Sequence, residues 1–460
     1  MSNKPVKLFF WLFLISLPFG FRTLLFQFTP DFNEYGAVFL YASDILMVLF
    51  LVCAIKNPFS PKRPKLALWV FCGGFLFSAG LSIFFASYKL LAFYNFLRLI
   101  LLVLTALAIA EILKKNWVRL ENILAVLVGS AVFQSLVAFS QFLNQKSLGL
   151  WFLGESVLSP EISGVAKIVV AGGKILRAYG TFPHPNILAA FLLLGLFGSY
   201  YFLFTSNRSG KKNFLSDLAI ILAVFLISLG LVLAFSRAAW FLGIFSTLFF
   251  IFFLFRQKDF RQRIYYFSAT LFFIFLILIS GFGWLIFPRA QIYLNEPAVS
   301  QRVSYNELGW YLAKSHPLGV GLGNQVVFSI ENGVYQLFGM NQVWQRQPTH
   351  NIYLLVGSEI GVFGLSVFLV FLVKILISNF SAPARGWSAP GRKGGSASGG
   401  KFLIFKQTED YKYLRFGITT LMFAALLGFG LFDHFLWTLQ PGRLMFWLVL
   451  GIIWGTRPRS

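Results

Sequence analysis

Residues 348–370 read PTHNIYLLVGSEIGVFGLSVFLV and join a polar stretch of the chain to a long apolar run. The apolar run covers residues 351–379 and is longer than the roughly 20 residues that a helix needs to cross a bilayer. We therefore predict a membrane-spanning helix that begins directly after His350. An imidazole has an ordinary pKa of about 6.5 and exchanges a proton near neutral pH. His350 is thus a candidate for proton transfer at the membrane boundary, unless it only caps the helix.

The composition of the whole chain also indicates a membrane protein. Hydrophobic residues make up 57% of the 460 residues and charged residues only 12%, whereas soluble domains have about 25% charged residues. We therefore expect an all-α, polytopic integral membrane protein whose main surroundings are the lipid bilayer. The formal net charge of +23 would suggest nucleic-acid binding in a soluble protein. No pattern of basic and aromatic residues supports that partner, so no nucleic acid is expected.

Apolar runs of spanning length predict about twelve transmembrane helices. They cover residues 8–28, 37–55, 66–86, 90–112, 118–143, 185–205, 214–235, 237–255, 264–287, 351–379, 413–433 and 440–456. Lys and Arg are concentrated in every second connection, and connections of that kind face the cytoplasm. The alternation predicts that both termini are cytoplasmic and that the long connections 144–184 and 288–350 lie on the outer side.

The order of these runs divides the chain into four parts. Residues 1–180 contain the N-terminal transmembrane helices and the first outer loop, and residues 181–379 form a core with the large loop 288–350. Residues 380–411 are rich in Gly and Ser, which indicates a flexible cytoplasmic linker. Residues 412–460 form a C-terminal segment of two helices.

Two charged residues lie well inside predicted spans. Asp44 and Arg98 are each about eight or nine residues from the outer end of their helix. Because a helix rises about 1.5 Å per residue, both side chains lie at a similar depth. Opposite charges at one depth predict an intramembrane ion pair. Such a pair serves either as a structural clamp between helices or as part of a proton or substrate pathway.

Four arginines gather on the predicted outer side, against the usual charge bias of that side. They are Arg237, Arg289, Arg302 and Arg346. Each one alone would be explained as a surface or snorkelling residue. Together they favour binding of a phosphate or pyrophosphate, because guanidinium is a planar donor that stays charged.

Neither a metal site nor a cofactor is expected from the sequence. The four histidines, His184, His316, His350 and His434, have no partner at the helical spacing of metal ligands. The outer loops also lack a paired-carboxylate motif that would hold Mg²⁺. Residues 316–324 read HPLGVGLGN, but they do not follow a strand in a βαβ unit, so they resemble a phosphate-binding loop only superficially. A tight turn, or flexible backbone near a substrate, is expected there.

Several short motifs follow one another in an informative order. They are Ser236-Arg237-Ala238-Ala239-Trp240, Arg302 before Gly309-Trp310, the segment 316–324, His350-Asn351-Ile352-Tyr353-Leu354, and Asp433-His434-Phe435-Leu436-Trp437. In this order the chain resembles the O-antigen ligase and polymerase superfamily of bacterial envelope glycosyltransferases. The resemblance is firmest over about residues 180–370.

The resemblance implies a helical membrane fold of the C-type glycosyltransferase kind, in the bacterial inner membrane, with a large helical periplasmic loop. It implies a glycan donor on undecaprenyl pyrophosphate and an acceptor hydroxyl on a lipid, glycan or protein. The transfer would be inverting and metal-independent, at the periplasmic face. By motif, His350 would be the base, and Arg237 and Arg302 would hold the pyrophosphate. Arg289 and Arg346 are added to the substrate site from their positions. The motifs do not separate a ligase from a polymerase.

Two other functions remain open from the sequence. Twelve spans with cytoplasmic termini are also typical of a transporter or flippase of envelope lipids or polysaccharide. The Asp44 and Arg98 pair would favour that function, although no repeat between the two halves is visible. A peptidoglycan polymerase would need an acidic catalytic residue in the large loop. The available carboxylates have no distinctive setting, and they are Glu296, Glu307 and Glu331.

Overall fold

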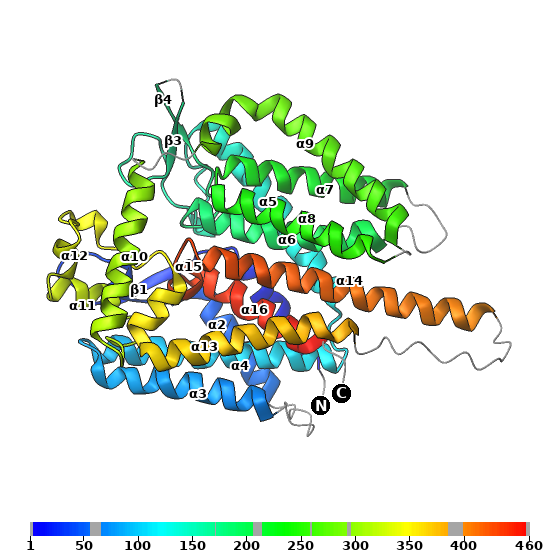
Figure 1. Cartoon of the computed structure of the whole chain (residues 1–460). Coiled ribbons are helices and arrows are strands. Elements are labelled where there is room, and N and C mark those ends of the chain that lie inside the picture. The colour runs from blue at the N-terminus through cyan, green and yellow to red at the C-terminus, as the bar shows by residue number, and fades with distance from the viewer. Residues whose placement is uncertain are drawn as a thin grey trace.

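The computed structural model is a bundle of long helices, with hairpins and short helices gathered at one end (Figure 1). It describes residues 3–55, 66–170, 172–205, 214–257, 260–291, 296–384 and 399–456. Within these ranges, eight helices are long and apolar enough to cross a membrane. They are α4 (Lys89–Lys114), α5 (Leu120–Asn144), α6 (Pro185–Thr205), α7 (Phe214–Leu233), α8 (Arg237–Phe255), α9 (Arg261–Ala290), α13 (Ile352–Ala384) and α14 (Gly399–Gly430). The all-α, polytopic class is confirmed. The sequence predicted about twelve spans, whereas eight helices in the described ranges have spanning length and composition.

The other four predicted spans contain shorter helices. They are α1 (Lys4–Ser16), α2 (Ala42–Ile55), α3 (Leu66–Ser82) and α16 (Gln440–Thr456). The predicted spans 8–28 and 37–55 are wrong over part of their length, because strands β1 (Arg22–Gln27) and β2 (Ala37–Tyr41) form a hairpin there. The helix α1 ends at Ser16, shortly before Pro18, and a proline has no backbone N–H with which to continue the helical hydrogen bonds. A short apolar run does not separate strand from helix.

A second hairpin lies inside the long connection 144–184. Its strands β3 (Lys167–Val170) and β4 (Gly173–Leu176) pair in antiparallel fashion. Three of the four residues of β3 are β-branched, which favours this conformation. Ile168 packs in a small cluster with Phe235 and Leu285, so the hairpin is held against the start of α8 and the end of α9. Strand β4 leads directly into Arg177, which reaches the candidate site.

The large connection 288–350 is helical, as the family resemblance implied. It contains α10 (Pro297–Ser315), α11 (Gln325–Glu331), α12 (Val334–Leu337) and a 3-10 turn (Val343–Gln345). These elements share a small core made of Tyr305, Leu308, Leu312, Val320, Val326, Val334, Tyr335 and Met340. Helix α10 crosses the end of the bundle and packs on α13 (Figure 1). The connection is therefore a packed unit on the bundle end.

The glycine-rich segment 316–324 forms a tight turn that is docked on α13. The backbone N–H of Val320 donates to the carbonyl of Ser358 at 2.8 Å, and that of Gly321 donates to the carbonyl of Glu359 at 3.0 Å. Gly319 has a φ of +84°, and a Cβ there would lie 2.3 Å from the carbonyl oxygen of Glu359. Only glycine fits such a position. The turn thus ties the large connection to the helix that follows His350.

Replacing Gly319 by alanine is expected to lower the melting temperature of the detergent-solubilised protein more than replacing Gly339. Both glycines have a positive φ, +84° and +73°, so both substitutions cost about 1–2 kcal/mol of backbone strain. A Cβ at Gly339 would meet no atom within 4 Å, whereas one at Gly319 would collide with α13. Equal shifts in melting temperature for the two variants would contradict the docking of the turn.

Helix α6 is the most buried of the eight candidate spans, with 89% of an 18-residue apolar stretch buried inside the protein. It packs against α5, α7 and α14. Its first residue, Pro185, suits a helix start because the ring fixes a helical φ. The next residue, Asn186, is thereby held at the loop-bearing end of the bundle, beside His184.

The segment predicted as a flexible linker, 380–411, is partly helical. Helix α13 continues to Ala384 and α14 begins at Gly399, so the linker prediction is wrong for residues 380–384 and 399–411. Residues such as Lys, Leu, Gln and Glu follow Gly400, and these are good helix formers. Residues 385–398 lie outside the described part of the chain.

Candidate active site

His350 lies at the loop-bearing end of the bundle, immediately before α13, and is held between two aromatic rings. Its imidazole stacks on Tyr305 of α10, with ring centroids 4.8 Å apart, and meets the edge of the His434 ring, also at 4.8 Å. The cap of α13 is a different residue. The Asn351 side chain accepts from the backbone N–H groups of Tyr353 at 2.9 Å and Leu354 at 3.2 Å. His350 is therefore free of the capping role.

The hydrogen bond of His350 selects its tautomer. Nδ1 lies 3.0 Å from the carbonyl oxygen of Pro348. A carbonyl only accepts, so Nδ1 carries the proton and Nε2 keeps its lone pair. In this form the ring is ready to take a proton at Nε2.

A buried carboxylate lies beside the imidazoles. Asp433 follows α14, and its Oδ1 accepts from the backbone N–H of His434 at 2.8 Å. Its Oδ2 accepts from the side-chain amide of Asn186 at 2.7 Å. The next element, α15 (Phe435–Thr438), holds Thr438, whose hydroxyl lies 2.7 Å from Nδ1 of His434. The C-terminal motif that carried part of the resemblance therefore lies in the same cluster as His350.

Asn186 connects the Asp433 carboxylate to Arg177, Ser236 and His184. Its Oδ1 accepts from Arg177 Nη2 at 2.9 Å and from the Ser236 hydroxyl at 3.1 Å. Its backbone N–H donates to His184 Nδ1 at 3.2 Å, so the proton of His184 is on Nε2. Sequence reasoning missed Asn186 and Arg177. The available signal was weak: Asn186 follows a proline at a predicted helix start, and Arg177 is one more cation on the predicted outer side.

Replacing Asn186 by alanine is expected to destabilise the protein by about 1–3 kcal/mol, because buried Arg177 and Asp433 would each lose a hydrogen-bond partner. Thermal unfolding in detergent measures this effect. Asn332→Ala is the matched control, since the exposed amide of Asn332 donates only to a carbonyl of its own helical turn. Unfolding of the two variants at the same temperature would contradict the bridging role of Asn186.

The four arginines singled out in the sequence do not form one group. Arg302 makes no hydrogen bond or ion pair with any residue in the described ranges. Arg237 and Arg289 share the Glu296 carboxylate, at 2.7 Å and 3.1 Å. Arg346 turns instead toward Asp31, at 3.8 Å. The site thus brings His350 together with Arg302, with Arg237 and Arg289 next to them, and directs Arg346 to the first hairpin.

Electrostatic effects show how close these groups are. Burial lowers the pKa of His350, and the charge of Arg302 lowers it further, while Asp433 raises it. Burial and Arg177 lower the pKa of His184 to about 3, and burial and His350 lower that of His434 to about 3. The three imidazoles are therefore neutral at neutral pH.

Asp433 and Arg177 are the buried charges of the cluster. Burial acts to raise the pKa of Asp433, but the imidazoles and Arg302 outweigh it and hold this pKa well below its usual range. Burial lowers the pKa of Arg177 to about 9, and repulsion from Arg289, Arg302 and Arg237 adds to this effect. Four guanidinium groups thus lie near one another, and in the described ranges Glu296 is the one carboxylate that pairs with any of them.

No group of three or more His, Cys, Asp or Glu side chains with a geometry for a metal ion occurs in the described ranges. What this site presents is the Nε2 lone pair of His350, an ionised carboxylate and several guanidinium groups. These are groups for proton transfer and anion binding.

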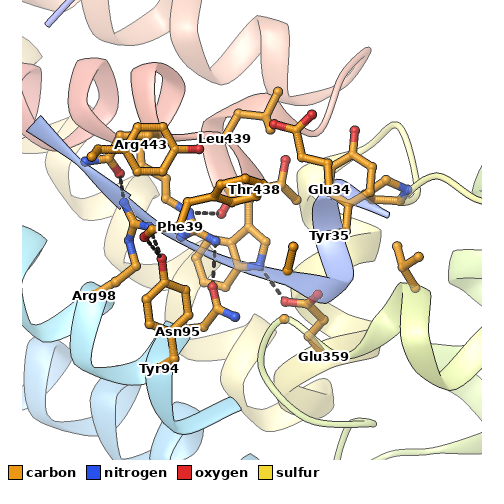
Figure 2. A pocket seen from close by; sticks show the side chains of 17 residues that line it. Glu34, Tyr35, Phe39, Tyr94, Asn95, Arg98, Glu359, Thr438, Leu439 and Arg443 are labelled. Atoms are coloured by element: carbon orange, nitrogen blue, oxygen red, sulfur yellow. Dashed lines mark hydrogen bonds between the residues drawn. The ribbon is translucent and has the colours of Figure 1, made fainter. Parts of the chain in front are cut away.

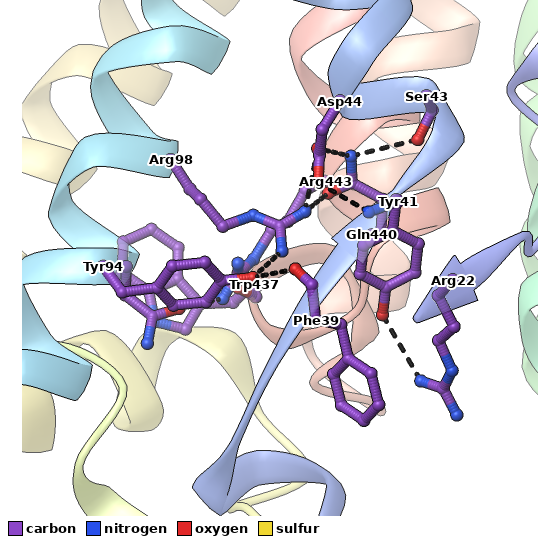
Figure 3. A network of polar contacts seen from close by, with 11 residues as sticks. Arg22, Phe39, Tyr41, Ser43, Asp44, Tyr94, Arg98, Trp437, Gln440 and Arg443 are labelled. Atoms are coloured by element: carbon purple, nitrogen blue, oxygen red, sulfur yellow. Dashed lines mark hydrogen bonds and ion pairs between the residues drawn. The ribbon is translucent and has the colours of Figure 1, made fainter. Parts of the chain in front are cut away.

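The predicted ion pair between Asp44 and Arg98 is confirmed. Arg98 Nη2 lies 3.1 Å from Asp44 Oδ1, and Gln440 Nε2 donates to the same oxygen at 2.6 Å. Arg98 also hydrogen-bonds Gln440 and the hydroxyl of Tyr94 (Figure 3). The network joins α2, α4 and α16, which is the arrangement of a clamp between helices.

A small polar cavity lies next to this clamp (Figure 2). Its wall includes Arg443, which donates to Asn95 at 3.0 Å, and Trp437, whose indole N–H donates to Glu359 at 2.7 Å. Pro348 and Thr438 line it as well, so it borders the histidine cluster. Its volume of ≈ 50 Å³ is enough for a few water molecules but too small for a sugar ring.

The bundle of apolar helices and the polar cluster at its end define a polytopic membrane protein with a candidate active site at the membrane boundary. Residues 222–369 match the family model described as O-Antigen ligase. This match supports the resemblance of the motifs to the O-antigen ligase superfamily. The matched region contains Arg237, Arg289, Arg302 and His350, whereas Asn186 and Asp433 lie outside it. A search of curated proteins found no match.

Proposed function

We propose that this protein is a membrane glycosyltransferase that moves a glycan from an undecaprenyl-pyrophosphate donor to an acceptor hydroxyl, as an O-antigen ligase or polysaccharide polymerase. The observation that carries the proposal is the Nε2 lone pair of His350 beside α10, the helix that carries Arg302. Tyr305 of this helix stacks on the His350 ring, and Arg302, one turn earlier, has no hydrogen-bond or ion-pair partner in the described ranges. One group takes a proton and the other binds an anion, and glycosyl transfer from a pyrophosphate needs both. The active site would face the periplasm, with both termini in the cytoplasm, as the Lys and Arg distribution predicts.

In the proposed reaction the acceptor oxygen attacks the anomeric carbon of the donor sugar while Nε2 of His350 takes the hydroxyl proton. The bond between the anomeric carbon and the pyrophosphate oxygen breaks, and its electron pair stays on that oxygen. The new bond forms on the opposite face of the carbon, so the configuration inverts. Asp433, ionised and buried beside the imidazoles, stabilises the imidazolium that forms at His350.

The growing negative charge on the leaving pyrophosphate would be stabilised by Arg302, Arg237 and Arg289. Preorganised cations in a site with little water are effective for this purpose. We add Arg177 to this group, because it is buried and donates to the carbonyl of Ala234, next to the Phe235 carbonyl that Arg289 uses. Arg346 would have to leave Asp31 to take part in binding the pyrophosphate.

The experiment that tests the proposal uses the purified full chain in proteoliposomes with a lipid-linked oligosaccharide. A covalent glycan product together with released undecaprenyl pyrophosphate would support the transferase. A ladder of products would indicate a polymerase, and a single transfer a ligase. Movement of the lipid-linked glycan across the membrane without any covalent product would instead show a flippase and overturn the proposal.

The pH dependence of kcat/KM is expected to have an acid limb below pH 6.5. The base must be neutral, and burial and Arg302 lower the pKa of His350 from 6.5. The active form therefore persists below that pH and is lost as the pH falls through the lowered pKa. Asp433→Asn should move the limb to still lower pH, because the carboxylate raises the pKa of His350. Initial rates over a pH series measure both, and an acid limb above pH 6.5 would contradict this assignment.

A further inference from the structure

Glu296 holds an unusual position among the arginines of the site. Its Oε2 lies 2.7 Å from Nη2 of Arg237, and its Oε1 lies 3.1 Å from Nη1 of Arg289. One carboxylate is thus shared by two guanidinium groups from the facing ends of α8 and α9. Two acceptor oxygens held by two arginines is also the arrangement in which a phosphate group binds.

The two arginines do not depend on Glu296 for their orientation. Arg237 Nη1 donates to the carbonyl oxygen of Gln291 at 2.9 Å. Arg289 Nε donates to the carbonyl oxygen of Phe235 at 3.2 Å. The backbone therefore holds both guanidinium groups in place, and an anion that replaced Glu296 would find them already oriented.

Glu296 is also connected to the catalytic end of the site through α10. It is the residue immediately before that helix, and α10 carries both Arg302 and Tyr305. Tyr305 stacks on the ring of His350. Release of Glu296 from the arginines would free the first turn of the helix that presents these two residues.

We propose that Glu296 is an internal anion that occupies the site formed by Arg237 and Arg289 when no donor is bound. The diphosphate of the donor displaces it, and the carboxylate returns as the pyrophosphate product leaves. The exchange keeps the two cations partly neutralised in the empty protein and weakens product binding. This inference rests on the proposed function, since it takes the donor's pyrophosphate as the competing anion.

Inorganic pyrophosphate is the probe that tests the exchange. It is titrated into the purified full chain in detergent, at constant ionic strength, with isothermal calorimetry as the readout. Glu296→Gln should bind pyrophosphate about fivefold tighter than the wild type, because a competing charge worth up to about 1 kcal/mol is removed. Glu307→Gln is the matched control. It removes the same charge from an exposed position on α10 and should leave the affinity unchanged.

Two further variants keep the test decisive. Glu296→Asp, whose shorter side chain cannot reach both arginines equally well, should bind with intermediate affinity even if the glutamine variant folds poorly. In an Arg289→Gln background, Glu296→Gln should gain less than in the wild type. Equal or weaker binding by Glu296→Gln, or the same gain in Glu307→Gln, would overturn the exchange and leave the proposed function intact. If neither the wild type nor any variant bound pyrophosphate, the proposed donor site would fail together with the exchange.

Discussion

His350→Ala is expected to reduce the rate of glycan transfer by about 10²–10⁴-fold, the range that a positioned general base contributes. In this structure the His350 imidazole is available for proton transfer. Its Nδ1 is engaged by the carbonyl of Pro348, and its Nε2 keeps a lone pair that can accept a proton. His184 does not replace it, since its Nδ1 accepts from the backbone N–H of Asn186, which leaves the ring proton on Nε2. Turnover of a lipid-linked oligosaccharide in proteoliposomes measures the loss.

His316→Ala is the control for this variant. His316 lies in the same large connection, at the C-terminal end of α10, but its ring contacts Phe328 and Ser315 and not the cluster. It should transfer glycan at close to the wild-type rate. A His350→Ala protein that matched the wild type would remove the general base from the mechanism, while an equal loss in both variants would point to a structural effect.

Arg302→Ala is expected to lower kcat by about 10²–10³-fold, as loss of a preorganised charge stabiliser does in other enzymes. The effect should fall on catalysis and not on folding, because Arg302 has no protein partner in the described ranges that would be left unpaired. Arg302→Lys should recover part of the rate, since it keeps the charge but loses the planar fork of donors. Steady-state rates, with melting temperatures recorded in parallel, separate the two effects.

Arg346→Ala provides the comparison within the arginine set. Its side chain is directed to Asp31, so this variant is expected to lose less activity than Arg302→Ala. If the two substitutions had equal effects on kcat, Arg346 would belong to the anion site after all. If Arg302→Ala kept wild-type turnover and donor binding, the role proposed for Arg302 would be lost.

The membrane class and several local features could be predicted from the sequence, because they depend on residues close together in the chain. Run length and apolar composition predict long helices in water-free surroundings. The predicted ion pair of Asp44 and Arg98 does form, although the depth assigned to Asp44 was wrong, because residues 37–41 form β2 and Asp44 lies in the first turn of α2. The hairpin at β1 and β2 was missed for a related reason: a short apolar run contains the same residue types in a strand as in a helix, and pairing between strands decides which forms.

The sequence by itself determined the class of protein and pointed to His350 as the group with a transferable proton. Tertiary structure alone decided what surrounds that imidazole. It placed Asp433 against Asn186, 247 positions away, and made Asn351 the cap of α13. It paired Arg237 and Arg289 with Glu296 and Arg346 with Asp31, and it left Arg302 without a partner among the described residues. The physical reason is that hydrogen bonds and ion pairs act over about 3–4 Å. Such distances between remote segments are set by how the helices pack, so they do not follow from the spacing of residues along the chain.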